Sequence, residues 1–161
     1  EAWIKLKANS IVDERIIDSL YRASQAGVPV DLQVRGICCL RAGIPGLSEN
    51  INVRSILGRF LEHSRIYAFC NSGDPEVFIG SADLMHRNLD RRIEALVSIA
   101  DLDMREHLID LVTTACSDSV QSWKLEADGW KHIVEGVDGK RLKHTQDLLM
   151  AAARSRVAAK H

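Results

Sequence analysis

The sequence predicts an α/β protein in which one mixed β-sheet is flanked by α-helices. Two observations lead to this prediction: a strand, a helix and a second strand follow one another near the N-terminus, and two antiparallel hairpins occur further along the chain. The 161 residues are 46% hydrophobic and 27% charged, a composition typical of an ordinary globular domain. We therefore expect a single domain over residues 1–161.

A strand and a helix are predicted in the first part of the chain. Apolar and basic side chains alternate over residues 3–7, which indicates a strand with one polar face. Apolar residues then recur at helical spacing over residues 16–24. Ser10 or Asp13 can cap the start of this helix, and Gly27 can end it.

Residues 28–36 form the second predicted strand, "VPVDLQVRG". A strand, a helix and a strand joined by short connections form a βαβ unit, so the two strands should be parallel with a right-handed crossover. Lys7 and Asn9 then share one edge of the sheet with Arg35. Ligands of open α/β sheets tend to bind at this edge.

The middle of the chain is predicted as a loop, a short helix and a hairpin. Residues 39–53 are rich in Gly, Pro, Ser and Asn, which is typical of a loop, and a short helix is expected near residues 53–61. Residues 65–69 and 76–79 are β-rich runs separated by the turn "CNSGDP". They should pair as antiparallel strands.

Polar residues converge at the open end of this predicted hairpin. In an antiparallel pair, the beginning of the first strand lies beside the end of the second. His63 and Arg65 should therefore lie next to Gly80, Ser81 and Asp83. This convergence favours a binding pocket over a hairpin whose ends are polar by chance.

The remaining elements alternate between strand and helix. Residues 91–99 are predicted as a strand, and residues 101–118 as an amphipathic helix with apolar residues such as Leu102 facing the core. The segment 120–161 is predicted as a second hairpin followed by a terminal helix, for which Thr145 is a cap candidate.

Composition excludes several classes of function. A net charge of −1 argues against a general nucleic-acid-binding surface, so we expect no nucleic-acid partner. Four cysteines without C-x-x-C spacing fit reduced thiols better than a zinc site or a disulfide framework. No run reaches membrane-spanning length, no leader opens the chain, and the first residue is not Met. We expect a cytoplasmic chain that is cut from a longer polypeptide.

The arginine-rich middle of the chain and His63 suit phosphoryl chemistry. From Arg35 to Arg92, every cationic side chain other than histidine is an arginine, whose planar fork matches phosphate or carboxylate. Histidine can exchange a proton near neutral pH, and a Gly-Ser turn can donate to phosphate oxygens. The alternatives are solvated arginines and a histidine that caps the preceding helix. His86 and His107 are interpreted as solvated.

Three long stretches resemble a known family: "IKLKANSIVDERIIDSLYRASQAGVPVDLQVRGICCLRAG", "LSENINVRSILGRFLEHSRIYAF" and "FIGSADLMHRNLDRRIEAL". Together they are similar to the C-terminal domain of the type 1 polyphosphate kinases, from about Trp3 to Ser119. The resemblance implies that residues 1–161 form the second phospholipase-D-like domain of such an enzyme. It also implies reversible transfer of the terminal phosphate of ATP to polyphosphate, with Mg²⁺ and a phosphohistidine intermediate.

The resemblance also assigns roles to individual residues. The arginine of "VRG" and the histidine of "LEH" line the nucleotide site of the family, and they fall on Arg35 and His63. His63 is expected to support catalysis, because the phosphorylated histidine and the Mg²⁺ ligands belong to the preceding domain. Further contacts to phosphate or polyphosphate are expected from Lys5, Arg65, Ser81, Arg87 and Arg91. ATP or ADP, polyphosphate and the preceding domains are the expected partners.

Two alternative functions stay open. Phospholipase D enzymes carry His-x-Lys followed by Asp and Gly-Ser, whereas this chain has His63, Arg65, Gly80 and Ser81 without the Asp after Arg65. A phosphodiesterase formed from two such domains is one alternative. A non-catalytic nucleotide- or polyphosphate-binding module is the other. The full-length enzyme is expected to be a homo-oligomer, with membrane association as an open alternative to a purely cytoplasmic location.

Overall fold

Three parallel strands form the centre of the sheet in the computed structural model, which describes residues 2–158. β1 (Ile4–Ala8) pairs with β2 (Val30–Val34), and β2 pairs with β3 (Ile51–Ser55), both in parallel. The predicted βαβ unit is thus confirmed. Residues 1 and 159–161 lie outside the described part, so the last residues of the predicted terminal helix are not covered.

Antiparallel strands extend the sheet on both sides of this centre. The order is β6-β5-β4-β1-β2-β3-β7-β8, and the short strand β9 pairs in parallel with β7. The added strands are β4 (Ile66–Phe69), β5 (Glu76–Gly80), β6 (Leu96–Ser98), β7 (Val120–Glu126), β8 (Gly129–Ile133) and β9 (Lys143–His144). Both predicted hairpins are present, as β4 with β5 and β7 with β8.

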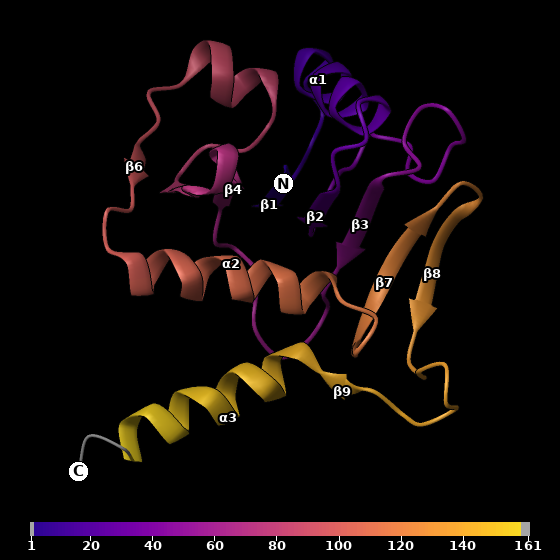
Figure 1. Ribbon diagram of the computed structural model, residues 1–161, viewed down its shortest axis with the longest axis vertical. Coiled ribbons are helices and arrows are strands. Elements are labelled where there is room, and N and C mark those ends of the chain that lie inside the picture. The colour runs from indigo at the N-terminus through magenta and orange to yellow at the C-terminus, as the bar shows by residue number, and fades with distance from the viewer. Residues whose placement is uncertain (1, 159–161) are drawn as a thin grey trace.

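Two helices cover opposite faces of the sheet, and a third follows β9 (Figure 1). They are α1 (Glu14–Gln25), α2 (Leu102–Cys116) and α3 (Thr145–Ala158). A 3₁₀ turn, η1 (Asn71–Gly73), connects β4 to β5, and a π-helical turn, η2 (Arg87–Arg91), precedes β6. Asp13, one of the two predicted caps, accepts hydrogen bonds from the backbone amides of Arg15 and Ile16 at the start of α1.

The two faces of the central strands differ in polarity. Leu6, Leu32 and Val53 point to the face that packs against α1, where Ile17 and Leu20 complete the larger core cluster. The opposite face of the central strands carries polar side chains at alternate positions: Lys5, Lys7, Asp31, Gln33, Asn52 and Arg54. Because one face is apolar, the register of β1 to β3 is fixed, and every intervening polar residue must face α2.

The prediction of a short helix at residues 53–61 is wrong. Residues 51–55 instead form β3, and the chain from 56 to 65 contains neither a helix nor a strand. Ile51 and Val53 alternate with Asn52 and Arg54, which is the period of a strand. Arg54 obscured this pattern, because an arginine in a sequence suggests a solvated side chain. In the structure, Arg54 is only 1% exposed.

α2 packs on the sheet mainly through its C-terminal half. Val112, Ala115 and Cys116 are buried, whereas Leu102 is 71% exposed, so the expected inward position of Leu102 is wrong. Leu102 directly follows Asp101, which caps the helix by accepting from the amide of Met104 at 2.8 Å. Across residues 2–158, no helix is long and apolar enough to cross a membrane.

Candidate phosphate-binding site

Basic side chains gather where β1 and β2 end and β4 begins. The two parallel strands end at the same edge of the sheet, and β4 runs antiparallel to β1, so its first residues lie there too. Lys7, Arg35, His63 and Arg65 come together in this way, and we call these four residues the basic edge. Burial lowers the pKa of Lys7, and the nearby charges of Arg35 and Arg65 lower it further.

Asp83 aligns the two arginines of the basic edge. Its buried carboxylate accepts from Nε and Nη2 of Arg65 at 3.3 and 3.1 Å, and from the backbone amide and Nδ2 of Asn9 at 2.7 and 3.2 Å. Oδ1 of Asn9 in turn accepts from Nε and Nη2 of Arg35 at 3.1 and 3.0 Å. Burial by itself raises the pKa of Asp83, but the hydrogen bonds from Arg65 and Asn9 outweigh it and hold the pKa below 3.8. A fixed negative charge therefore orients both guanidinium groups.

His63 is exposed and is held through one ring nitrogen. Nη1 of Arg65 lies 3.0 Å from Nδ1 of His63 and also donates to the carbonyl of His63 at 3.1 Å. A guanidinium group has only donors, so Nδ1 must accept and the proton of the neutral ring is on Nε2. The Nε2–H group is then free to donate to an oxygen of a ligand.

Lys7 is held by the partly buried carboxylate of Glu62. Its side chain is 2% exposed, and Nζ lies 3.0 Å from Oε2 of Glu62. Gln33 and Gln146 donate to the same carboxylate through Nε2, at 3.4 and 2.7 Å. Burial raises the pKa of Glu62, but these bonds, with that of Gln146 the strongest, hold it below its usual value of 4.5. Lys7 therefore keeps an ionised partner.

The structure brings together only some of the residues predicted from the sequence. Arg35, His63 and Arg65 share the basic edge. Lys5 lies earlier on β1, where Nζ is 2.7 Å from Oδ2 of Asp31. Arg65 thus joins the two residues expected at the nucleotide site, whereas Lys5 is engaged elsewhere.

The other three predicted contacts lie on the segment between β5 and β6. The hydroxyl of Ser81 donates to Glu94 and accepts from the amide of Ala95 at 3.0 Å. Arg87 and Arg91 are exposed residues of η2. None of these three makes a hydrogen bond with the basic edge within residues 2–158. Ser81 nevertheless lines the same hollow as Arg65, as the hairpin predicted.

Sequence reasoning placed Asp83 beside Arg65 at the end of the hairpin, and the two side chains are indeed bonded. It missed two other supporting residues of the site. Glu62 is adjacent to His63 but carried no pattern of its own. No sequence pattern pointed to Gln146, because its partner Phe60 is 86 residues away and the contact depends on where α3 begins.

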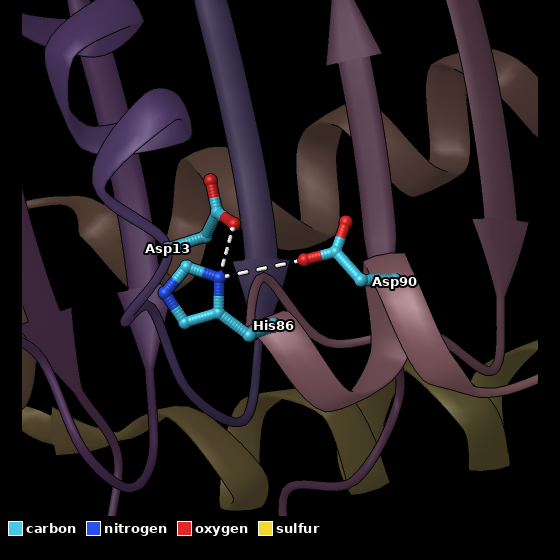
Figure 2. A group of neighbouring side chains, drawn as sticks. All are labelled: Asp13, His86 and Asp90. Carbon is cyan, nitrogen blue, oxygen red and sulfur yellow. Dashed lines mark ion pairs between the residues drawn. The ribbon is translucent and has the colours of Figure 1, made fainter.

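A second polar cluster lies nearby, where the start of α1 meets η2 (Figure 2). Nδ1 of His86 is 2.9 Å from Asp13 and 3.5 Å from Asp90, and Nε2 is 2.7 Å from Glu14. His86 was interpreted as solvated, but it lies among three carboxylates and is only half exposed. It connects η2 to the helix start, a long-range contact that the polar sequence around it did not reveal.

This cluster does not fit Mg²⁺. The ligand atoms of Asp13, His86 and Asp90 lie within 4.8 Å of one another. However, Nη2 of Arg15 already occupies both carboxylates, at 3.0 Å from Asp13 and 2.9 Å from Asp90, and Asp13 also caps α1. Mg²⁺ prefers an octahedral set of oxygens and retains several waters, whereas this cluster holds an imidazole and an arginine.

The fold and the site together define a class: an α/β domain with a phospholipase-D-like mixed sheet and a basic site at its strand ends. Polyphosphate kinase C-terminal domain 2 is the family that matches residues 1–146. The chain belongs to this family, as the resemblance predicted. It is 58% identical over 156 residues to the polyphosphate kinase of Streptomyces coelicolor and 47% identical over 149 residues to that of Pseudomonas aeruginosa.

These relatives are much longer than the chain. The matches cover 96% and 92% of this chain but 21% and 22% of the two relatives. The crystal structure of polyphosphate kinase from Porphyromonas gingivalis is similar with a TM-score of 0.88 and 36% identity, over 97% of this chain and 24% of that one. NucT from Helicobacter pylori has a TM-score of 0.54 and 14% identity over 70% of this chain and 77% of its own, a likeness of fold alone.

Proposed function

We propose that this chain is the phosphate- and nucleotide-binding part of a polyphosphate kinase, which reversibly transfers the terminal phosphate of ATP to inorganic polyphosphate. The observation that carries the proposal is the pair of arginines, Arg35 and Arg65, aligned by the buried Asp83 next to Lys7 and His63. Membership of the polyphosphate kinase family supports it. Because the chain spans about a fifth of its relatives, the rest of the active site belongs to the remainder of the polypeptide.

Each residue of the basic edge has a role that follows from its geometry. Arg35 and Arg65 contribute planar donors for the non-bridging oxygens of a nucleotide phosphate, and Lys7 adds a positive charge beneath them. Nε2–H of His63 donates to the phosphoryl group as its negative charge shifts during transfer. Phosphoryl transfer depends mostly on positioning and on such electrostatic stabilisation, so this chain needs no covalent step of its own.

Other components of the reaction are proposed to lie outside the chain. Mg²⁺ would be held by the preceding domains, where it would neutralise phosphate charge, because the Asp13 cluster fits it poorly. Those domains would also contribute the phosphorylated histidine. The four cysteines are thiols, which fits the reducing cytoplasm, and we propose a cytoplasmic homo-oligomer as the full-length form.

Substitution of the basic edge in the full-length enzyme tests the proposal. We expect Arg35→Ala and His63→Ala each to lower kcat/KM for ATP at least about tenfold, which is the scale of one lost charged or general-acid contact. Matched controls are Arg22→Ala on α1 and His107→Ala on α2, which remove exposed residues of the same types. The controls should keep the activity of the unmodified enzyme.

Near-normal kinetics in both Arg35→Ala and His63→Ala would contradict the proposal. Hydrolysis of a bis-ester phosphate substrate by the unmodified enzyme, lost in His63→Ala, would instead indicate a phosphodiesterase.

A further inference from the structure

A second basic hollow lies beside the loop that leads to His63. It has a volume of about 640 Å³ and lies between this loop and the segment from β9 into α3. We call it the β9 groove. Its lining includes Arg59, Arg141, Lys143, His144, Gln146 and Asp147.

The β9 groove has an excess of positive charge. Arg59, Arg141 and Lys143 are exposed and make no ion pair within residues 2–158, so their charges are available to a ligand. Asp147 is the acidic residue in the lining. α3 spans 14 residues and begins at Thr145, so the positive end of its dipole adds to the cationic side chains. These features favour a polyanion.

The β9 groove is joined to the basic edge by one side chain. Gln146 exchanges two hydrogen bonds with the backbone of Phe60, at 2.9 and 2.8 Å, and donates to Oε1 of Glu62 at 2.7 Å. Glu62 is the ion-pair partner of Lys7. His144 holds the same loop through Nε2, 2.6 Å from the carbonyl of Leu57. A ligand in the groove therefore lies against the loop that positions Lys7 and His63.

We propose that the β9 groove binds the linear polyphosphate chain and leads it to the basic edge, an inference that rests on the proposed function. Polyphosphate carries a negative charge on every unit, and the several cations of the groove suit such a repeating anion. Apart from the ring of His144, the described lining contains no aromatic side chain that could stack on a base. The chemistry of the groove therefore matches polyphosphate better than a nucleotide.

The test is the double variant Arg141→Gln with Lys143→Gln in the full-length enzyme, which removes two charges but keeps most of each side chain. In the ATP-forming direction, KM for a linear polyphosphate should rise about tenfold, the scale of one charge-assisted contact. KM for ADP and kcat should stay unchanged. Restoring both charges as Arg141→Lys with Lys143→Arg should recover most of the affinity.

Lys140→Gln is the matched control. Lys140 lies next to Arg141 and is 85% exposed, but its ammonium is paired with Asp138 at 3.1 Å and does not line the groove. An unchanged KM for polyphosphate in the double variant, or an equal rise in Lys140→Gln, would overturn the inference. An equal rise of KM for ADP would also overturn it, since the groove would then be a nucleotide site.

Failure of this inference can be told apart from failure of the proposed function. If Arg35→Ala impairs the enzyme and the double variant does not, only the groove is wrong. If Arg35→Ala and His63→Ala are both fully active, the proposed function itself is wrong.

Discussion

Asp83 shows why a site built from arginines needs a carboxylate. Two guanidinium groups at one sheet edge repel each other, and long side chains lose conformational entropy when they are ordered. Asp83 binds Arg65 directly and reaches Arg35 through Asn9, so both groups are ordered before any ligand arrives. This preorganisation lowers the cost of binding an anion there.

The depressed pKa of Asp83 predicts a pH dependence of stability. Its folded-state pKa lies below 3.8, so its contribution is fully present above about pH 4 and is lost as the pH falls through the folded-state value. Asp83→Asn should lower the free energy of unfolding by about 2 kcal/mol at neutral pH and by less at about pH 3.

Urea unfolding of the unmodified protein and of Asp83→Asn at both pH values measures this difference. Asp18→Asn is a suitable control, because Asp18 is an exposed carboxylate on α1. A constant difference between the two proteins from neutral pH to about pH 3 would show that the ionised carboxylate is not what stabilises the site.

The sequence predicted the four residues of the basic edge but not all of the residues that support them, because only the former belong to local patterns or to the family resemblance. Arg35 and His63 follow from the resemblance, and Arg65 follows from the hairpin, which is a local pattern. Lys7 was placed at the right edge by the parallel strands. Glu62 and Gln146 could not be predicted, because their role depends on contacts across 84 to 86 residues that leave no periodic pattern.

At the scale of elements, β3 is the clearest failure of sequence reasoning. Arg54 is buried and bonded to Asn52 at 3.1 Å, to Ser122 at 3.0 Å and to Asp118. A charged side chain in a strand normally indicates a face of the sheet that is exposed to solvent. Here it joins β3 to the start of β7, and two of its three partners, Asp118 and Ser122, are more than 60 residues away. By contrast, β1, α1, β2 and the two hairpins were predicted correctly, whereas the strand predicted at residues 91–99 is only the short β6.

The segment from β9 into α3 is expected to hold the loop before His63 in place. The backbone amide of Phe60 donates to Oε1 of Gln146 at 2.9 Å, so its exchange with solvent reports directly on this contact. Ending the chain after residue 142 removes His144 and Gln146. Amide exchange at residue 60 should then accelerate at least about tenfold, because the protecting acceptor is gone.

Ending the chain after residue 150 is the control for this truncation, since it shortens α3 but keeps His144 and Gln146. Equal protection of the Phe60 amide in both shortened chains would show that the loop is held by something other than Gln146.

At the scale of the whole molecule, a nearly neutral protein carries a localised positive field. The net charge is −1, yet cationic side chains are concentrated in the β9 groove and at the basic edge, where Arg35 makes no ion pair within residues 2–158. A highly charged substrate is thus attracted to one region and not to the surface as a whole. Interactions of this kind are screened within about 10 Å at 0.1 M salt.

Salt should therefore weaken the binding of polyphosphate more than that of ADP. Between about 50 and 300 mM salt, KM for polyphosphate should rise several-fold more than KM for ADP in the full-length enzyme, because the polymer makes more ionic contacts. The double variant of Arg141 and Lys143 should show a shallower dependence. Parallel salt dependences of the two KM values would contradict this account.

The contact between Phe60 and Gln146 also sets an order of events during synthesis. Domains fold from the N-terminus as the chain is translated, and β1 to β5 are complete long before Gln146 is made. The loop before His63 acquires its final anchor only when α3 has emerged. A nascent chain that ends before α3 can thus have most of its sheet in place and still lack the contact that holds the loop before His63.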